Sequence, residues 1–181
     1  MIEVLQEVPS EEVFNTGRTF NTVTDGHDEW LTPPYIVEAL GEFDLDPCSP
    51  ANPPWRTATT QYSLPVDGLE ANWEGRVWCN PPYGRETFKW LAKLADHGNG
   101  TALIFARTET KGFHSEIWEK AHSVFFFKGR LKFFKVTGEE GGTANAPSCL
   151  VSYSKNDTIQ IYKASKRGDL VGSLVLLNTK G

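Results

Sequence analysis

The residues best suited to chemistry are the run Asn80-Pro81-Pro82-Tyr83, which directly follows an apolar segment at 77–79. The side-chain oxygen of Asn80 and the backbone oxygen of Pro81 are hydrogen-bond acceptors, since proline keeps its carbonyl but lacks an N–H donor. Two acceptors aimed at a planar amino group, such as the exocyclic amine of adenine, would draw its nitrogen towards a tetrahedral, nucleophilic state. Pro82 helps to fix the backbone, so little reorganisation remains during reaction. The ring of Tyr83 offers a face on which a flipped base can stack. The competing interpretation is a rigid turn that closes a strand.

A second run, Asn52-Pro53-Pro54-Trp55, has nearly the same residue types. It lies inside a polar, proline-rich stretch and does not follow a predicted strand. We therefore expect it to shape the wall of a pocket, and we place the catalytic role at 80–83.

An acidic residue at the end of a strand indicates a cofactor site. Asp46, at the end of a predicted strand over 43–46, could accept a bond from a ribose hydroxyl or a cationic amine. The Asp46-Pro47 pair is also an ordinary start of a turn. The sequence contains no GxGxxG motif, and no glycine lies between Asp46 and Gly68. A pyrophosphate cradle is therefore disfavoured, whereas S-adenosylmethionine has no phosphates and needs none. Asp67 is a further candidate for the cofactor, with a surface turn as the alternative.

Several basic residues could contact nucleic acid. Arg107 follows a predicted strand at 101–106 and could meet a phosphate. Lys128, Arg130 and Lys132 lie in a stretch that mixes cations with phenylalanines, which can clamp a single strand or a flipped nucleotide. The alternative is a half-buried strand with solvated lysines.

Composition limits the remaining possibilities. The chain has 181 residues, a 39% apolar fraction and a net charge of −5, which predicts one folded domain and excludes a strongly basic coat. We expect DNA contact to depend on a one-sided basic patch formed by 128–135 and 155–167. No apolar run is long enough to span a membrane. The three cysteines are too widely spaced for a zinc site or a disulfide framework, so we expect no metal and a reducing, cytoplasmic setting.

Helices and short apolar strands alternate over residues 33–127, which predicts an α/β fold with a mostly parallel sheet. In the first helix, Thr32 is the expected N-cap and Pro33 the first helical residue. The other predicted helices cover 86–95 and 113–121, and the strands cover 43–46, 76–79, 101–106 and 123–127. Asp46 and Asn80 thus fall at the carboxyl ends of strands, where ligands bind in open α/β sheets.

The last third is rich in predicted strands, which suggests antiparallel additions at one edge of the sheet. We expect strands at 131–136, 148–153 and 158–162, a glycine-rich loop at 137–146, and a strand or extended arm at 169–177. The expected organisation is a flexible N-terminal arm over 1–28, a catalytic domain over 29–165, and a C-terminal tail or edge strand over 166–181.

The motifs together resemble the phage-type, Dam-like DNA N-6-adenine methyltransferase family. The resemblance covers about residues 28–153 and depends on the order and spacing of its elements. These elements are Asp28-Glu29-Trp30-Leu31-Thr32-Pro33, Leu45-Asp46-Pro47-Cys48, Asp67-Gly68-Leu69 with Trp73, Cys79-Asn80-Pro81-Pro82-Tyr83-Gly84, Ala106-Arg107-Thr108 and Gly129-Arg130-Leu131 before Phe133.

The resemblance implies a Rossmann-like, S-adenosylmethionine-dependent fold and methyl transfer to adenine in DNA, with 80–83 as the catalytic motif. It implies that Thr32-Pro33 and Asp46-Pro47-Cys48 contact the cofactor. A bacteriophage origin, and so a bacterial host cytoplasm, is implied in the same way. The chain departs from the family pattern because the usual glycines after Asp46 are absent.

Three alternatives remain open from the sequence. The acceptor could be adenine in RNA or a glutamine side chain in a protein, because each presents a planar NH₂ group. A third alternative is a nucleic-acid-binding relative without turnover. The recognition sequence and the oligomeric state also stay open.

Overall fold

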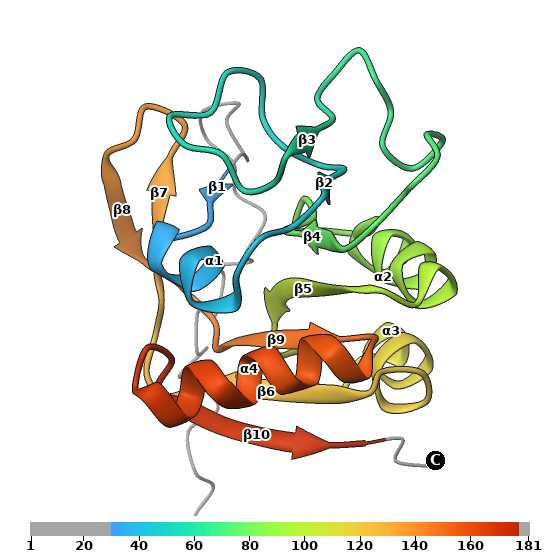
Figure 1. Cartoon of the computed structure of the whole chain (residues 1–181), viewed down its shortest axis with the longest axis vertical. Helices are drawn as coiled ribbons and strands as arrows, with labels where there is room; N and C mark the ends of the chain where they lie inside the picture. Colours follow the sequence, from blue (N-terminus) through green and yellow to red (C-terminus); the bar gives the residue numbers. More distant parts are fainter. Residues whose placement is uncertain (1–29, 178–181) are drawn as a thin grey trace, which may run out of the picture.

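The computed structural model describes residues 30–177, which form both strands and helices (Figure 1). The arm expected at 1–28 lies outside the described residues. In chain order the elements are β1 (Trp30–Leu31), α1 (Pro34–Leu40), β2 (Leu45–Asp46), β3 (Thr60–Gln61), β4 (Val77–Cys79), α2 (Thr87–His97), β5 (Gly100–Phe105), α3 (Lys111–Phe113), the π-helix η1 (His114–Trp118), β6 (Ser123–Phe127), β7 (Lys132–Lys135), β8 (Glu140–Thr143), β9 (Ser148–Ser152), α4 (Lys155–Arg167) and β10 (Gly172–Leu176).

The main sheet has seven strands in the order β10-β6-β9-β5-β4-β2-β3. Its pairings make β2, β3, β4, β5 and β6 run in one direction, and β9 and β10 in the other. The predicted α/β class is confirmed, and the sheet is mixed. One expectation needs correction, because β9 lies between β5 and β6 and not at an edge. All five residues of β9 are buried, and a strand apolar on both faces belongs in the interior of a sheet.

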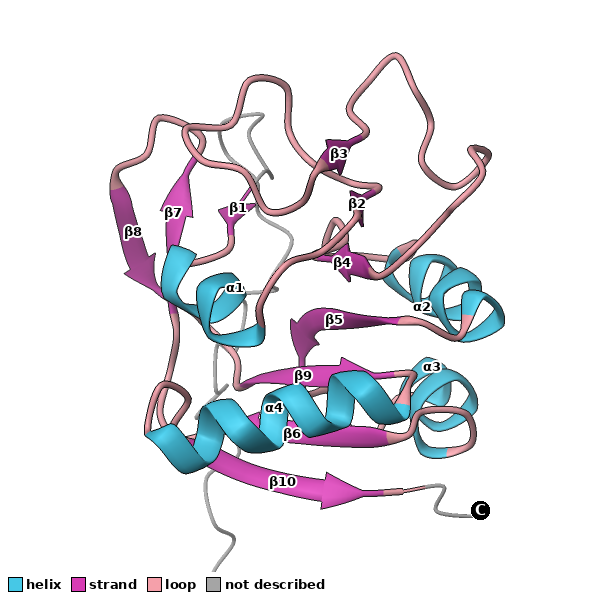
Figure 2. Ribbon diagram, viewed as in Figure 1, coloured by secondary structure: helices cyan, strands magenta, loops and turns pink. Residues whose placement is uncertain are grey.

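Helices pack on both faces of the main sheet (Figure 2). Side chains that alternate along the central strands build two cores, one on each face. Trp78, Leu103, Phe125 and Leu150 pack with apolar residues of α1 and α4. Their sequence neighbours point to the opposite face, where they pack with α2, α3 and η1. These neighbours are Val77, Cys79, Ala102, Ile104, Val124, Cys149 and Val151. The rigid strands that carry Asp46 and Asn80 are therefore held from both sides.

A second, small sheet has the order β1-β7-β8 and is hereafter called the small sheet. Its strand β8 forms where a glycine-rich loop was predicted at 137–146, so that prediction was wrong. Lys132 pairs with Thr143 and Phe134 with Glu140, which makes β7 and β8 a hairpin. Strand pairing outweighs the weak strand propensity of the glycines in β8.

Helix α4 replaces the strand predicted at 158–162. The polar–apolar alternation there suggested a strand, but Ile161 and Ala164 are buried at helical spacing. The N-cap of the helix is Ser154, whose hydroxyl accepts a hydrogen bond from the Asp157 backbone N–H at 3.0 Å. It ends at Gly168, which adopts a φ of 85°. These two end signals would have identified the helix from the sequence.

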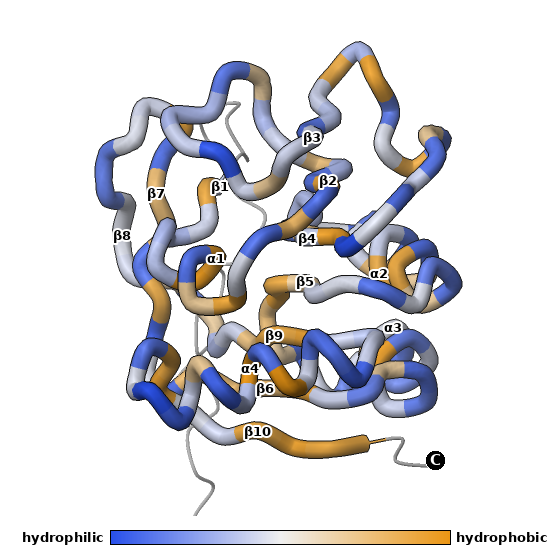
Figure 3. The backbone as a smooth tube through the Cα atoms, in the orientation of Figure 1, coloured by the Kyte–Doolittle hydropathy of each residue, from blue (hydrophilic) through white to orange (hydrophobic). Residues whose placement is uncertain are grey.

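Two further boundaries differ from expectation. Pro33, not Thr32, is the N-cap of α1, and Pro34 is its first residue. The helix predicted at 113–121 is split into α3 and η1 and ends at Trp118. The segment expected as a strand or arm contains β10, an exposed, strongly apolar edge strand antiparallel to β6 (Figure 3). None of the described helices is long and apolar enough to cross a membrane.

Candidate active site

The order of the strands predicts where a ligand binds. From β2 the chain continues outward to β3, whereas β4 lies on the other side of β2 and is followed by β5. This reversal of direction is the switch point at which open α/β sheets bind ligands, beyond the carboxyl ends of the strands. A cavity of about 140 Å³ lies there, lined by Asp46 from the end of β2 and by Asn80 and Tyr83 after β4. A cavity on the order of 150 Å³ accommodates one aromatic ring.

The amide of Asn80 has a defined orientation. Its Nδ2 donates a hydrogen bond of 2.8 Å to the backbone oxygen of Trp30, and a carbonyl can only accept. The amide oxygen must therefore be on the opposite side. There, Oδ1 accepts a long hydrogen bond of 3.4 Å from the hydroxyl of Tyr83. A carbonyl oxygen has a second lone pair, so Oδ1 can also accept a bond from a ligand N–H in the cavity.

Tyr83 is supported by two phenylalanines. Its ring stacks on Phe105, with centroids 4.2 Å apart and planes at 14°. Phe133 meets the Tyr83 ring edge-on, with centroids 6.2 Å apart. Burial raises the pKa of Tyr83 well above its ordinary value of 10, so the phenol stays protonated and donates to Asn80. Because Phe105 covers one face, a base has only the other face of Tyr83 for stacking.

The backbone of the run at 80–83 is hydrogen-bonded to the first residue of α2. Pro81 is buried and Pro82 is exposed. The hydroxyl of Thr87 donates to the Pro82 carbonyl at 2.8 Å and accepts from the Gly84 N–H at 3.0 Å. The run is thus a braced turn on the wall of a cavity, so the rigid-turn interpretation and the functional one both describe it.

Asp46 is a buried carboxyl group in the wall of the cavity. The Cys48 backbone N–H donates to Oδ1 at 3.1 Å, and the hydroxyl of Thr57 donates to Oδ2. Burial dominates over these bonds and raises the pKa of Asp46 to about 6. At neutral pH the group is mostly ionised, with few protein partners in a buried place. Such a carboxylate attracts a ligand amine or hydroxyl.

Thr32 supports the same interpretation. Its side chain lines the cavity and is only 2% exposed, yet Oγ1 has no hydrogen-bond partner among residues 30–177. Buried hydroxyls are normally paired, so an unpaired one at a cavity wall fits a polar ligand. Thr32, Asp46 and their neighbour Gln61 thus place several hydrogen-bonding groups in one wall of the cavity. Pro33 follows as the cap of α1.

The residues beside Asp46 also have structural roles. A Cβ at Gly68 would lie 1.9 Å from the carbonyl oxygen of Pro47, so the loop around Gly68 packs directly on the Asp46-Pro47 turn. Cys48 lines the cavity, with its Sγ 3.8 Å from that of Cys79. Burial raises the pKa of the Cys48 thiol well above 9, so the thiol stays neutral.

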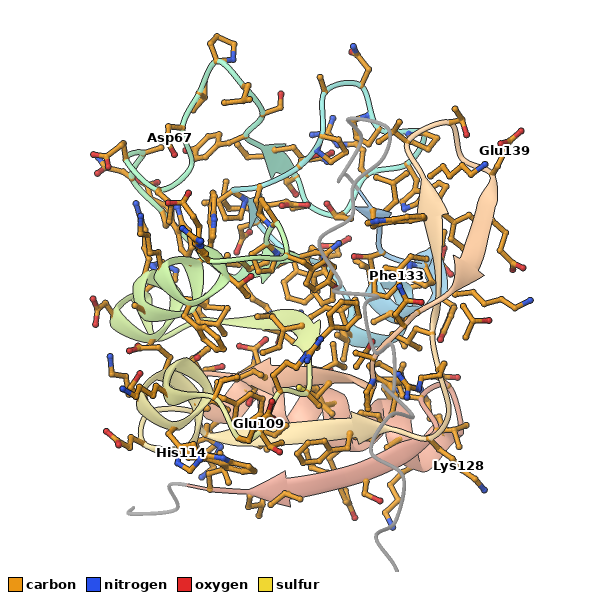
Figure 4. The ribbon with its side chains drawn as sticks, turned by 180° about the vertical axis from the view of Figure 1, so that it is seen from behind. Asp67, Glu109, His114, Lys128, Phe133 and Glu139 are labelled. Carbon is orange, nitrogen blue, oxygen red and sulfur yellow. The ribbon has the colours of Figure 1, made fainter. Side chains whose placement is uncertain are left out.

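Asp67 lies apart from this cavity. It is exposed, and its Oδ1 accepts a 2.9 Å hydrogen bond from the Leu69 backbone N–H. Figure 4 shows Asp67 on an outer loop of the molecule. The structure therefore gives Asp67 a local turn-forming role, and its predicted contact with the cofactor stays a prediction.

The predicted nucleic-acid contacts also lie outside the cavity lining. Lys128 and Arg130 are exposed in the turn after β6, and Figure 4 shows Lys128 far from Asp67. Lys132 forms an exposed ion pair of 2.9 Å with Glu140, and Arg107 follows β5. In the expected basic patch, Lys135 and Arg167 are likewise paired with acids. The patch is thus partly neutralised, and DNA contact by these residues stays a prediction.

Sequence reasoning missed three residues of the site. Trp30 contributes a backbone carbonyl, which no side-chain pattern reveals, and Thr57 and Gln61 come from the proline-rich loop and the short strand β3. From the second proline run, Pro53 and Trp55 line the cavity as expected for a pocket wall. Among residues 30–177, no group of three or more His, Cys, Asp or Glu side chains could hold a metal ion.

Comparison with known proteins gives one match. Neither the curated proteins nor the solved structures include a significant match to this chain. The family model described as DNA N-6-adenine-methyltransferase (Dam) matches residues 19–172, which include the elements around the cavity and most of the sequence. With Asn80 and Asp46 at the predicted strand ends and this match over most of its length, the chain belongs to the DNA N-6-adenine-methyltransferase (Dam) family.

Proposed function

We propose that this protein transfers a methyl group from S-adenosylmethionine to the exocyclic amine of an adenine flipped out of DNA, on a Rossmann-like fold. The observation that carries the proposal is the fixed orientation of the Asn80 amide. Its nitrogen is held by Trp30, so its oxygen is available to an amino group in a cavity that also contains Tyr83. Membership of the Dam family supports adenine in DNA as the acceptor.

In this proposal two oxygens activate the acceptor amine. Asn80 Oδ1 and the Pro81 carbonyl accept hydrogen bonds from its two N–H groups and increase the electron density on the nitrogen. The open face of Tyr83 stacks on the base, while Phe105 supports the ring from behind. These groups are fixed before the substrate arrives, and such preorganisation is usually the largest contribution to catalysis.

The opposite side of the cavity would hold the cofactor. Thr32, Asp46 and Cys48 line it, with Pro33 and Pro47 as their neighbours. When bound, S-adenosylmethionine would supply an electrophilic methyl group. The chain needs no separate general base, because a methylated adenine ammonium is strongly acidic and loses its proton readily.

The test uses radiolabelled S-adenosylmethionine with three acceptors: double-stranded DNA, RNA of the same sequence and a glutamine-containing peptide. We expect label in DNA only, recovered as N6-methyladenine. Label in RNA or peptide instead would reassign the acceptor. Failure to bind the cofactor at millimolar concentration in calorimetry would favour a non-catalytic, nucleic-acid-binding relative.

A further inference from the structure

The small sheet contacts the catalytic run, although the two are far apart in the sequence. Trp30, whose carbonyl holds the Asn80 amide, belongs to β1 and pairs with Lys135 of β7. β1 contains only two residues and pairs only with β7 among the described strands. The position of the Trp30 carbonyl, and with it the direction of Asn80 Oδ1, therefore depends on β7.

The same hairpin also contacts Tyr83. Phe133 of β7 is only 4% exposed and meets the rings of both Tyr83 and Phe105 edge-on, with centroids 6.2 and 6.4 Å away. Figure 4 places Phe133 on β7, away from the hairpin turn at Glu139. The β7–β8 hairpin thus contacts Tyr83 directly through Phe133 and reaches Asn80 indirectly, through the pairing of β7 with Trp30 of β1.

Strand β8 completes the arrangement because it packs closely on β1 and β7. A Cβ at Gly141 would lie 2.6 Å from Cζ3 of Trp30 and 2.7 Å from the Phe133 carbonyl oxygen. The next residue, Gly142, has no atom within 4 Å of the corresponding point. Any added carbon at Gly141 must therefore displace Trp30 or the β7 backbone.

We propose that the small sheet is a positioning element for methyl transfer: it directs the Asn80 oxygen through the Trp30 carbonyl and places the Tyr83 ring through Phe133, with Gly141 and Phe133 as positioning residues. The inference rests on the proposed function. The expected loss of rate follows from the precision that catalysis requires, since a displacement of about 1 Å caused by a distant change can lower the rate about 100-fold.

The matched pair Gly141→Ala and Gly142→Ala tests this role. Both variants add one methyl group to β8, but only the first meets neighbours. For Gly141→Ala we expect kcat to fall about 10- to 100-fold, while the Kd for S-adenosylmethionine in calorimetry stays close to wild type. Gly142→Ala should match wild type in both. Equal kcat values for the two variants would overturn the proposal.

A second readout does not need turnover. The side-chain amide signals of Asn80 in an NMR spectrum, assigned by their loss in Asn80→Asp, should shift in Gly141→Ala and stay in place in Gly142→Ala. If wild type fails to methylate DNA but these shifts occur, the proposed function is wrong and the positioning contact stands. Unchanged Asn80 signals in a folded Gly141→Ala would contradict the contact.

Phe133→Leu covers the case in which Gly141→Ala does not fold. Leucine keeps an apolar side chain in the core and removes the edge-on ring contact with Tyr83. We expect a lower kcat with unchanged cofactor affinity and a cooperative thermal transition. A wild-type kcat in this variant would overturn the role assigned to Phe133.

Discussion

The two Asn-Pro-Pro-aromatic runs have nearly the same sequence and very different surroundings. Asn80 follows β4, whose residues Val77–Cys79 are all fully buried, and its amide is fixed by the Trp30 carbonyl. Asn52 is exposed on a loop with a φ of 52°, and it does not line the cavity. From the second run, Pro53 and Trp55 reach the cavity wall.

The difference shows that the chemistry depends on what anchors the asparagine. Both runs contain an amide oxygen, two prolines and a ring. Only the first is attached to a buried strand and has its amide nitrogen occupied, which leaves the oxygen for a substrate.

Replacing each asparagine should have opposite consequences. Asn80→Ala removes an acceptor from the amine and should slow methyl transfer by about 100- to 1,000-fold, as for the loss of one preorganised polar group. Asn52→Ala should leave the rate close to wild type. Single-turnover assays at saturating cofactor measure both, and thermal melting checks the fold. Comparable losses in the two variants would remove the distinction between the runs.

The group that holds the loop of the second run, the Asp46 carboxyl, is titratable. The group that holds Asn80, the Trp30 carbonyl, is not. Asp46 holds Thr57 of the same loop, and its pKa rises from 3.8 to about 6 on folding. Because the folded state favours the protonated form, this stabilising contribution is full below about pH 4 and is lost as the pH rises through 6. The difference amounts to about 3 kcal/mol in the free energy of unfolding.

Asp46→Asn should remove that pH dependence, making the cofactor-free protein more stable at pH 7 while weakening its affinity for S-adenosylmethionine. Urea unfolding between pH 4 and 8 measures the first effect and calorimetry the second. If the free energy of unfolding of the variant depends on pH as steeply as that of wild type, another group titrates. Tighter cofactor binding by the variant would contradict the role of Asp46.

The two aromatic residues should differ less than the two asparagines. Tyr83→Ala removes a stacking partner whose contribution is about 1–3 kcal/mol per base, which should appear as a lower kcat/KM for DNA. Trp55→Ala loses the edge-on contact between the Trp55 and Phe134 rings, whose centroids lie 5.2 Å apart. It should mainly reduce stability, by about 1 kcal/mol. A greater kinetic loss in Trp55→Ala would place base stacking at the second run.

The smallest effect concerns the backbone of Asn52. Its positive φ suits glycine and asparagine, so Asn52→Gly should be nearly neutral. The β-branched Asn52→Val should cost about 1–2 kcal/mol, because a left-handed conformation brings Cβ close to the carbonyl oxygen. Chemical denaturation of the two variants measures the difference, and equal stability would show that the loop relaxes.

Sequence patterns predicted β2, β4 and β5 better than β1 and β3, two short strands that also line the cavity, and better than β8 and α4. β4 and β5 were expected because short apolar runs end at Asn80 and near Arg107, and Asp46 and Asn80 do line one cavity. Local signals suffice there, because Asp46 and Asn80 are each followed by a proline and the strands before them are buried.

The remaining features depend on contacts that the sequence does not reveal. β8 exists because β7 pairs with it, and its glycines read as a loop. The anchoring of Asn80 by a carbonyl 50 residues away involves no side-chain signature. The missed α4 is different. The sequence shows its N-cap at Ser154 and its C-cap at Gly168, but the short polar–apolar alternation at 158–162 suggested a strand.

The position of β9 in the sheet has a consequence for the chain while it is being translated. Strands β5 and β6 are each complete by Phe127, yet the strand that joins them begins only at Ser148. Until the ribosome has released that segment, both strands present unpaired edges, which are templates for aggregation. Translation arrested between 128 and 147 would therefore leave an aggregation-prone nascent chain, whereas release past Ser152 would let β9 pair with both strands and leave only the outer edge of β6 for β10.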